Sequence, residues 1–322
     1  MENHILRPGP NDAGKRIDRI LRSCFPDVPL SALFAALRKG AVRVGGQRVG
    51  GDYRVNEGDL ISVKKFPGFC LQPKPQQKQQ QKPWRKSRQT GTRGIQFPPV
   101  FEDKNFLAVN KPWGILTHGD SSLDESIKAS LAPRLPPSLA FSPAPLHRLD
   151  RNTTGLIFFS KSLEGAREFS AALREGKITK IYYALVEGIL PAAQTWEDSL
   201  IRDSKNRVTK SSRSGPSPRP GKTALTQVRP LAHSSSYSLC ELIIHSGRTH
   251  QIRSQAALHA HPLAGDRKYG GHPLPGAPHK GAYILHAAKL SFPPLEAEAP
   301  LPQDAAAFLK KLFPGFTEYP LR

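Results

Sequence analysis

The sequence is poor in cysteine, in long apolar runs and in acidic residues relative to basic ones. Its three cysteines, Cys24, Cys70 and Cys240, are odd in number and far apart, so the sequence encodes neither a disulfide framework nor a zinc site. The first residues lack the apolar stretch of a secretory signal. No apolar run approaches the roughly 20 residues that a membrane span requires. These features predict a cytoplasmic protein without a membrane anchor.

Acidic residues are scarce enough to leave a large positive charge. Lysine and arginine number 47 against 26 aspartates and glutamates, which gives a formal net charge of +21. Such an excess favours a polyanionic partner and says little about the fold. Nucleic acid is the first candidate partner, and an anionic membrane surface is the second.

Composition divides the chain into three parts. Residues 66–97 are rich in Gln, Lys, Arg and Pro and contain almost nothing to bury, which predicts a basic linker. Its charges either keep a spacer solvated or add loose contacts to phosphates. The linker separates a small unit, residues 1–65, from a larger domain, residues 98–322.

The small unit carries signals for two short helices and a hairpin. Apolar residues at 17–24 follow the spacing of a helix with one buried stripe. A second helix is expected with Ser31 as its N-cap and Gly40 just past its end. Residues 42–44 then alternate between apolar and polar side chains before the turn signal Gly45-Gly46. The pattern predicts a small α+β module of about 50 residues.

Basic side chains gather on this small unit. For any single one, a solvated surface position is the better interpretation. Taken together, they favour a face that binds phosphates. The candidates are Arg16, Arg19, Arg38, Lys39 and Arg43.

The larger domain alternates short apolar strands with loops. Helical spacing occurs between Ser162 and Gly176, at 249–260 and at 304–313. The remaining apolar segments are short, as expected for strands joined by turns. The pattern predicts a mixed, mainly antiparallel sheet, and the whole chain is expected to be an α+β protein.

Motifs for common cofactor and metal chemistries are missing from the sequence. Gly221-Lys222-Thr223 looks like the end of a phosphate-binding loop, but the glycine spacing fails and prolines precede it. No dinucleotide fingerprint follows a strand, and no G-x-S-x-G elbow is present. His259 and His261 have no third ligand at zinc spacing. We therefore expect neither a nucleotide cofactor nor a metal.

The densest group of reactive side chains is the segment 147–155, HRLDRNTTG. Asp150 lies within three residues of His147, Arg148 and Arg151. An aspartate repels phosphate, so its place in a nucleic-acid-binding protein needs a reason. One interpretation is a structural salt bridge or an Asx turn. The other is a carboxylate that adjacent positive charge keeps ionised, ready to act as a nucleophile or base.

Two further segments carry candidate residues. Arg253, in SGRTHQIR at 246–253, is either the ion-pair partner of a catalytic carboxylate, or a phosphate contact or surface charge. Tyr182 and Tyr183 are adjacent in an expected strand and must face opposite ways. We expect one of them in the core, while the other could stack on a base.

Together these segments resemble the RluA/RluC-like family of RNA pseudouridine synthases. The likeness spans about residues 98–300, and Thr154 stands where the family usually has serine. Its motifs are VNKPWG at 109–114, HRLDRNTTGLIFFSKS at 147–162, KIYYALV at 180–186, GRTHQIR at 247–253 and HPLAGD at 261–266. In the small unit, RKGAVRV at 38–44 and VNEGD at 55–59 resemble the S4 RNA-binding domain.

The resemblance implies conversion of uridine to pseudouridine in structured RNA, with 23S-type large-subunit ribosomal RNA as the expected substrate. It implies that Asp150 carries the chemistry, that Arg253 holds it ionised and that Tyr182 stacks on the base. Arg148 would enter the RNA stem as the uridine leaves it, and Ile252 would line the pocket. The reaction is redox-neutral, and a monomer without cofactor is expected. Two alternatives stay open: the same reaction on transfer RNA, and a non-catalytic RNA-binding factor in ribosome assembly.

Overall fold

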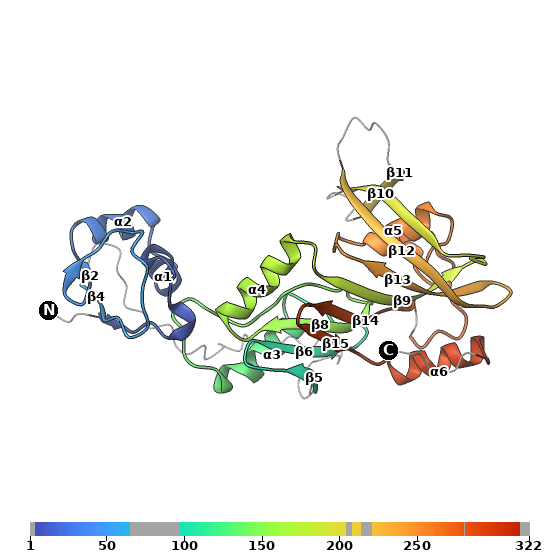
Figure 1. The fold of residues 1–322 in the computed structure, drawn as a ribbon, viewed down its shortest axis with the longest axis horizontal. Helices are drawn as coiled ribbons and strands as arrows, with labels where there is room; N and C mark the ends of the chain where they lie inside the picture. The colour runs from blue at the N-terminus through green and yellow to red at the C-terminus, as the bar shows by residue number, and fades with distance from the viewer. Residues whose placement is uncertain (1–3, 65–96, 204–207, 214–220, 280, 316–322) are drawn as a thin grey trace, which may run out of the picture. The chain divides into compact units, whose positions relative to one another are not determined.

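The computed structural model describes residues 4–64, 97–203, 208–213, 221–279 and 281–315 (Figure 1). The predicted basic linker at 66–97 lies outside the described residues, except for residue 97. The described residues form two compact units. The first comprises residues 4–64 with 128–144 and 161–164, and the second comprises the rest.

The first unit combines a small antiparallel sheet with two helices. Its elements are β1 (His4–Leu6), η1 (Pro10–Asp12), α1 (Ile17–Cys24), α2 (Leu30–Arg38), β2 (Val42–Val44), β3 (Gln47–Arg48) and β4 (Ile61–Val63). The strands lie in the order β1-β4-β2-β3. Apolar side chains of both helices, among them Ile20 and Leu33, share one core with those of β2 and β4.

The structure confirms the predicted helix at 17–24 and the predicted hairpin. Gly45 and Gly46 have φ of 54° and 82°, a conformation that the two-residue turn between β2 and β3 needs and that glycine adopts freely. Gly40, with φ of 69°, follows the end of α2 as predicted. The prediction of Ser31 as N-cap was wrong. The helix starts at Leu30 because Pro29 already supplies the extended N-cap backbone, and no side chain caps it.

Asp12 ties residues 128–144 to the first unit. Its fully buried carboxylate accepts hydrogen bonds from Ser138 Oγ at 2.6 Å and from the backbone N–H groups of Leu139 at 2.8 Å and Ala140 at 3.0 Å. Leu139 and Ala140 also pack against the unit's apolar core. These bonds compensate the cost of burying the carboxylate.

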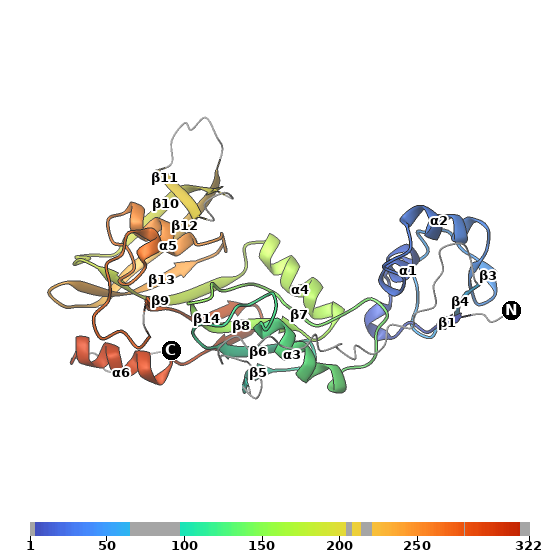
Figure 2. The same cartoon turned by 180° about the vertical axis from the view of Figure 1, so that it is seen from behind.

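The second unit is built on one long sheet (Figure 1, Figure 2). Its strands follow the order β11-β10-β12-β13-β9-β14-β8-β6-β5, with β15 on β14 and β7 on β8. Their bounds are β5 (Pro99–Glu102), β6 (Phe106–Lys111), β7 (Ala144–Pro145), β8 (Thr154–Ser160), β9 (Thr179–Glu187), β10 (Gln194–Asp203), β11 (Val208–Arg213), β12 (Lys222–His233), β13 (Tyr237–Ile244), β14 (Leu285–Phe292) and β15 (Leu295–Glu298). In that order, β8 and β14 pair in parallel, whereas the other neighbours are antiparallel. The predicted fold class, α+β with a mainly antiparallel sheet, is confirmed.

The longer helices are α3 (Leu123–Leu131), α4 (Leu163–Arg174), α5 (Gln251–Leu258) and α6 (Gln303–Leu312). α4 and α6 agree with the predicted spans. α5 is shorter than 249–260 because His250 and Ala260 adopt left-handed backbone conformations, with φ of 53° and 62°. It packs against β10 and β11. Among the described residues, none of the helices has both the length and the apolar character to cross a membrane.

Candidate active site

The predicted site residues of the larger domain meet in one cleft of the second unit. The cleft has a volume of about 380 Å³. Asp150 lies in the loop directly before β8, Tyr182 lies in β9, and Ile252 and Arg253 lie in α5. Arg148 is exposed at the cleft, whereas Ile252 is 5% exposed and forms part of its wall. Loop, strand and helix thus bring these five side chains together across about 100 residues of sequence.

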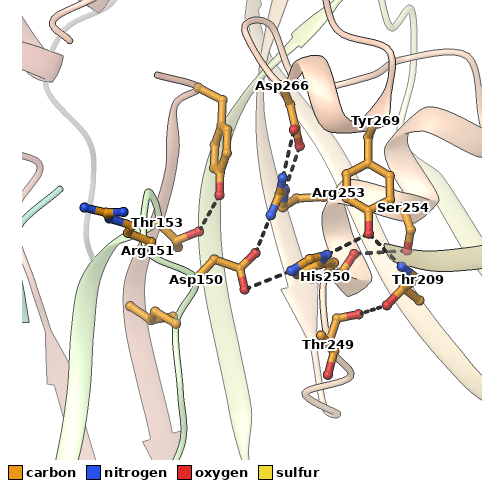
Figure 3. A network of polar contacts seen from close by, with 12 residues as sticks. Asp150, Arg151, Thr153, Thr209, Thr249, His250, Arg253, Ser254, Asp266 and Tyr269 are labelled. Atoms are coloured by element: carbon orange, nitrogen blue, oxygen red, sulfur yellow. Dashed lines mark hydrogen bonds and ion pairs between the residues drawn. The ribbon is translucent and has the colours of Figure 1, made fainter. Parts of the chain in front are cut away.

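Arg253 bridges two carboxylates (Figure 3). Its Nε and Nη2 donate to the two oxygens of Asp266 at 2.6 and 2.8 Å, and its Nη1 donates to Asp150 Oδ2 at 2.8 Å. The guanidinium also lies near the rings of Tyr269 and Tyr283, at 5.0 and 4.7 Å from their centroids. A planar fork with fixed donors can hold both carboxylates at once, which the ammonium of lysine cannot do in the same geometry.

The two carboxylates differ in their exposure to solvent. The side chain of Asp266 is 2% exposed, that of Arg253 is 9% exposed, and that of Asp150 is 20% exposed. Burial alone lowers the pKa of Arg253, but its bonds to Asp266 and Asp150 outweigh this effect and raise it. Asp266 therefore fixes a permanently charged arginine, and Asp150 is the carboxylate that faces the cleft.

The ring of His250 faces the second carboxylate oxygen of Asp150. Tyr269 Oη accepts the backbone N–H of Thr209 at 2.8 Å and contacts His250 Nδ1 at 2.7 Å. Burial lowers the pKa of His250, although Asp150 opposes this. In the neutral ring, Tyr269 donates its single proton to Nδ1, which places the ring hydrogen on Nε2. Nε2 lies 3.6 Å from Asp150 Oδ1, so both oxygens of Asp150 face donors.

Lys111 holds the loop that carries Asp150. Its fully buried Nζ donates to three carbonyl oxygens, including that of Arg151 at 3.1 Å. Burial lowers the pKa of Lys111 to about 7, although the charge of Asp150 opposes this. On the other side of Asp150, Thr117 Oγ1 bonds both the carbonyl and the N–H of Leu149 at 2.8 and 3.1 Å. The backbone is thus fixed before and after the carboxylate.

The two adjacent tyrosines lie in different surroundings. Tyr182 is 7% exposed and lines the cleft, whereas Tyr183 is 3% exposed and is not among the lining residues. Burial raises the pKa of Tyr182, and the charge of Asp150 raises it further. Tyr182 therefore presents a neutral ring close to Asp150.

The basic residues predicted to bind phosphates differ in how they are engaged within the first unit. Arg16 forms an ion pair with Asp18 at 2.8 Å, and Arg43 donates to the carbonyls of Gly40 and Gly46. Arg19, Arg38 and Lys39 are exposed, and no ion pair joins them to another described residue. These three have their charge available for a ligand.

Four residues of the site received no individual role from the sequence. Lys111, His250 and Asp266 stood within the motifs of the resemblance, and so did Lys180, a buried lysine of β9 that lines the cleft. What distinguishes these residues is that a charged or titratable side chain is buried. Burial cannot be read from the sequence. Within the described ranges, no group of three or more His, Cys, Asp or Glu could hold a metal ion.

The site combines a carboxylate paired with a buried arginine and an aromatic ring beside that carboxylate, and the first unit carries exposed basic residues. This combination is typical of an enzyme that modifies a nucleoside within RNA. Residues 105–258 match the family model described as RNA pseudouridylate synthase. The chain is 32% identical over 310 residues to ribosomal large subunit pseudouridine synthase C of Vibrio cholerae, covering 93% of this chain and 94% of the relative. It is 28% identical over 335 residues to ribosomal large subunit pseudouridine synthase D of Escherichia coli O157:H7, covering 96% and 94%.

Solved structures show the same fold. Human RNA Pseudouridylate Synthase Domain Containing 4 matches with a TM-score of 0.55 at 24% identity, covering 66% of this chain and 92% of that one. The human Domain Containing 1 protein matches with a TM-score of 0.53, covering 67% and 86%. The chain belongs to the RNA pseudouridylate synthase family. It is an RNA pseudouridine synthase, an isomerase.

Proposed function

We propose that the protein converts uridine to pseudouridine in large-subunit ribosomal RNA. The observation that carries this proposal is the carboxylate of Asp150, held by Arg253 and open to the cleft. The relatives that match more than nine-tenths of the chain are named for the large ribosomal subunit. Their names favour neither transfer RNA as the substrate nor a non-catalytic assembly factor.

In this proposal Asp150 is the catalytic residue. It either attacks the ribose or removes a proton from it, and the uracil detaches, rotates and is joined again through C5. Arg253 keeps Asp150 ionised, Tyr182 stacks on the base, and Ile252 closes the apolar wall. Arg148, exposed at the cleft, takes the place of the uridine in the stem, which offsets part of the unstacking cost.

The first unit would supply the non-covalent grip on RNA. We assign residues 1–65 to an S4-like RNA-binding domain, 66–97 to a linker and 98–322 to the catalytic domain. Arg19, Arg38 and Lys39 would contact phosphates directly, whereas Arg16 and Arg43 also shape the unit through their bonds within the chain. Every proposed catalytic side chain comes from one chain, so a monomer in the cytoplasm suffices, and the isomerisation needs no cofactor.

Tritium release tests the reaction and the substrate together. RNA labelled at C5 of uridine loses that hydrogen when the new carbon–carbon bond forms. We expect release from ribosomal RNA with the wild-type protein and none with Asp150→Asn. Release from transfer RNA alone would contradict the substrate, and undiminished release with Asp150→Asn would contradict the role of Asp150.

A further inference from the structure

Lys180 is a buried cation of the cleft that the described structure leaves without an acceptor. The residue is 5% exposed and lines the cleft. No hydrogen bond or ion pair joins its Nζ to another described residue. Nζ lies against Gly247, where an added Cβ would come within 3.1 Å of it. An ammonium with so little access to water needs compensation, and the cleft that it lines is where an acceptor can enter.

The position of Lys180 in β9 places it beside the proposed base platform. Lys180 and Tyr182 are two residues apart in this strand, so their side chains leave the same face. Both line the cleft. Their Cα atoms are separated by about 7 Å, the rise of two strand residues. A pyrimidine lying on the Tyr182 ring therefore has an edge within reach of the long lysine side chain.

The proposed reaction creates negative charge at this position. When the bond between C1′ and N1 breaks, its electron pair stays with the uracil, and the ring carries the charge on N1 and its carbonyl oxygens. This holds whether Asp150 forms a bond to the ribose or takes a proton from it. The pair is used again when C5 bonds to C1′, as the bond to Asp150 breaks or as the ribose takes its proton back from Asp150. The C5 proton then leaves to solvent and N1 takes up a proton, so the isomerisation is balanced without an oxidant or reductant.

We propose that Lys180 donates a hydrogen bond to a carbonyl oxygen of the uracil ring and stabilises the detached uracil anion. The inference rests on the proposed function of the same cleft. Burial lowers the pKa of Lys180 to about 8, which leaves the ammonium as the main form at neutral pH. Fixed positive charge in a site of low water content is most effective where charge develops during the reaction.

An RNA phosphate is the other acceptor that a lysine could take. Phe169, Leu173 and Gly247 line the same cleft. A flat ring can enter between such walls once its nucleotide leaves the stack. A phosphodiester is joined to a ribose on each side and binds exposed lysines more readily, whereas Lys180 is almost fully covered. The geometry therefore favours the base.

The first experiment separates an effect on the reaction from an effect on binding. Lys180→Met keeps the length of the side chain and removes its charge. With saturating enzyme and labelled ribosomal RNA, we expect the single-turnover rate to fall about 10- to 100-fold, the size of one hydrogen bond to a charged group. The RNA dissociation constant should change by less than about threefold, and its salt dependence should stay the same. Lys177→Met is the matched control, because Lys177 is 60% exposed and lies outside the cleft.

The second experiment asks whether Lys180 touches the base. The target uridine is first located in ribosomal RNA treated with the wild-type protein. A synthetic stem-loop then carries uridine, 2-thiouridine or 4-thiouridine at that position, since sulfur accepts hydrogen bonds poorly, and the product is separated after digestion. For uridine, the wild-type protein should react faster than Lys180→Met by the factor found in the first experiment. For the thio substrate whose sulfur replaces the oxygen bound by Lys180, the two proteins should differ by less than about threefold, because partners in contact do not contribute additively. A rate ratio of wild type to Lys180→Met that is the same for all three substrates overturns the proposal.

Two further outcomes would also overturn it. An unchanged saturating rate with weaker RNA binding and a salt slope lower by about 1 would make Lys180 a phosphate contact. An undiminished rate in Lys180→Met would remove Lys180 from the reaction. If Lys180→Met does not fold, Lys180→Leu serves instead, since it also removes the charge and should lower the rate in the same uridine-specific way. Failure of the wild-type protein to release tritium from any RNA would instead contradict the proposed function.

Discussion

The two carboxylates on Arg253 give the sharpest test of how stability and chemistry are divided in this site. Asp266 is 2% exposed and binds the guanidinium through two bonds of 2.6 and 2.8 Å. Asp150 is 20% exposed and binds it through one bond of 2.8 Å. Asp266→Asn and Asp150→Asn make the same chemical change on the same arginine, so each variant is the control for the other.

Asp266→Asn should destabilise the protein strongly. Removing the charge of one partner from a buried ion pair costs about 3–5 kcal/mol, because the other charge is left without full compensation. Asp150→Asn leaves the bidentate pair of Arg253 with Asp266 intact, and its cost should stay near the value of one hydrogen bond, about 1.5 kcal/mol or less. The measurement is urea unfolding followed by circular dichroism, comparing the transition midpoints at equal slope.

Turnover should show the opposite order. We expect no detectable tritium release from Asp150→Asn and a reduced but measurable release from Asp266→Asn, in which Asp150 is still present. Equal destabilisation by the two variants would refute the reasoning, because Asp150 would then be a structural carboxylate. Loss of turnover in Asp266→Asn without loss of stability would indicate that Asp266 is the catalytic carboxylate and Asp150 the structural one.

Three other predictions concern different parts of the chain. Lys111→Met should lower turnover at least tenfold, because the three carbonyl bonds that fix the Asp150 loop are lost; tritium release at saturating RNA checks this, and unchanged turnover would contradict it. Burial lowers the pKa of His286 from 6.5 to about 4, so the unfolded chain takes up the proton first as pH falls. The stability that this group contributes is complete above pH 6.5 and should be lost by up to about 3 kcal/mol between pH 6.5 and 4, which urea unfolding at several pH values would show; His286→Asn should flatten this dependence. Joint replacement of Arg19, Arg38 and Lys39 by Gln should lower the salt slope of RNA binding by roughly 0.7–0.9 per lost phosphate contact, whereas an unchanged slope would place the RNA elsewhere.

Elements defined by neighbouring residues were predictable from the sequence. The spacing at 17–24 specifies a helix with one buried stripe, and Gly45-Gly46 specifies a tight turn, because both depend on interactions within a few residues. The error at Ser31 has the same origin. A serine near a helix start favours capping on average, but Pro29 already takes the N-cap position two residues earlier.

The electrostatics of the site were less accessible from sequence. The pairing of Arg253 with Asp150 was anticipated through the resemblance, yet its two bonds to Asp266 depend on how α5 packs against the following loop. The orientation of His250 follows from a left-handed backbone and from Tyr269. Lys180 occurs in an apolar strand motif, and only the folded sheet shows that it is buried at the cleft.

The place of β14 in the sheet has a consequence for the synthesis of the protein. This strand, near the end of the chain, pairs with β8 on one side and with β9 on the other. The loop of Asp150 leads into β8 and Tyr182 lies in β9, so their spacing is set only when β14 is inserted between them. In a nascent chain whose residues 285–292 have not yet been synthesised, the first unit is present but the cleft has not formed. On the proposed RNA-binding role of the first unit, the protein would bind RNA during its own translation before it is able to modify it.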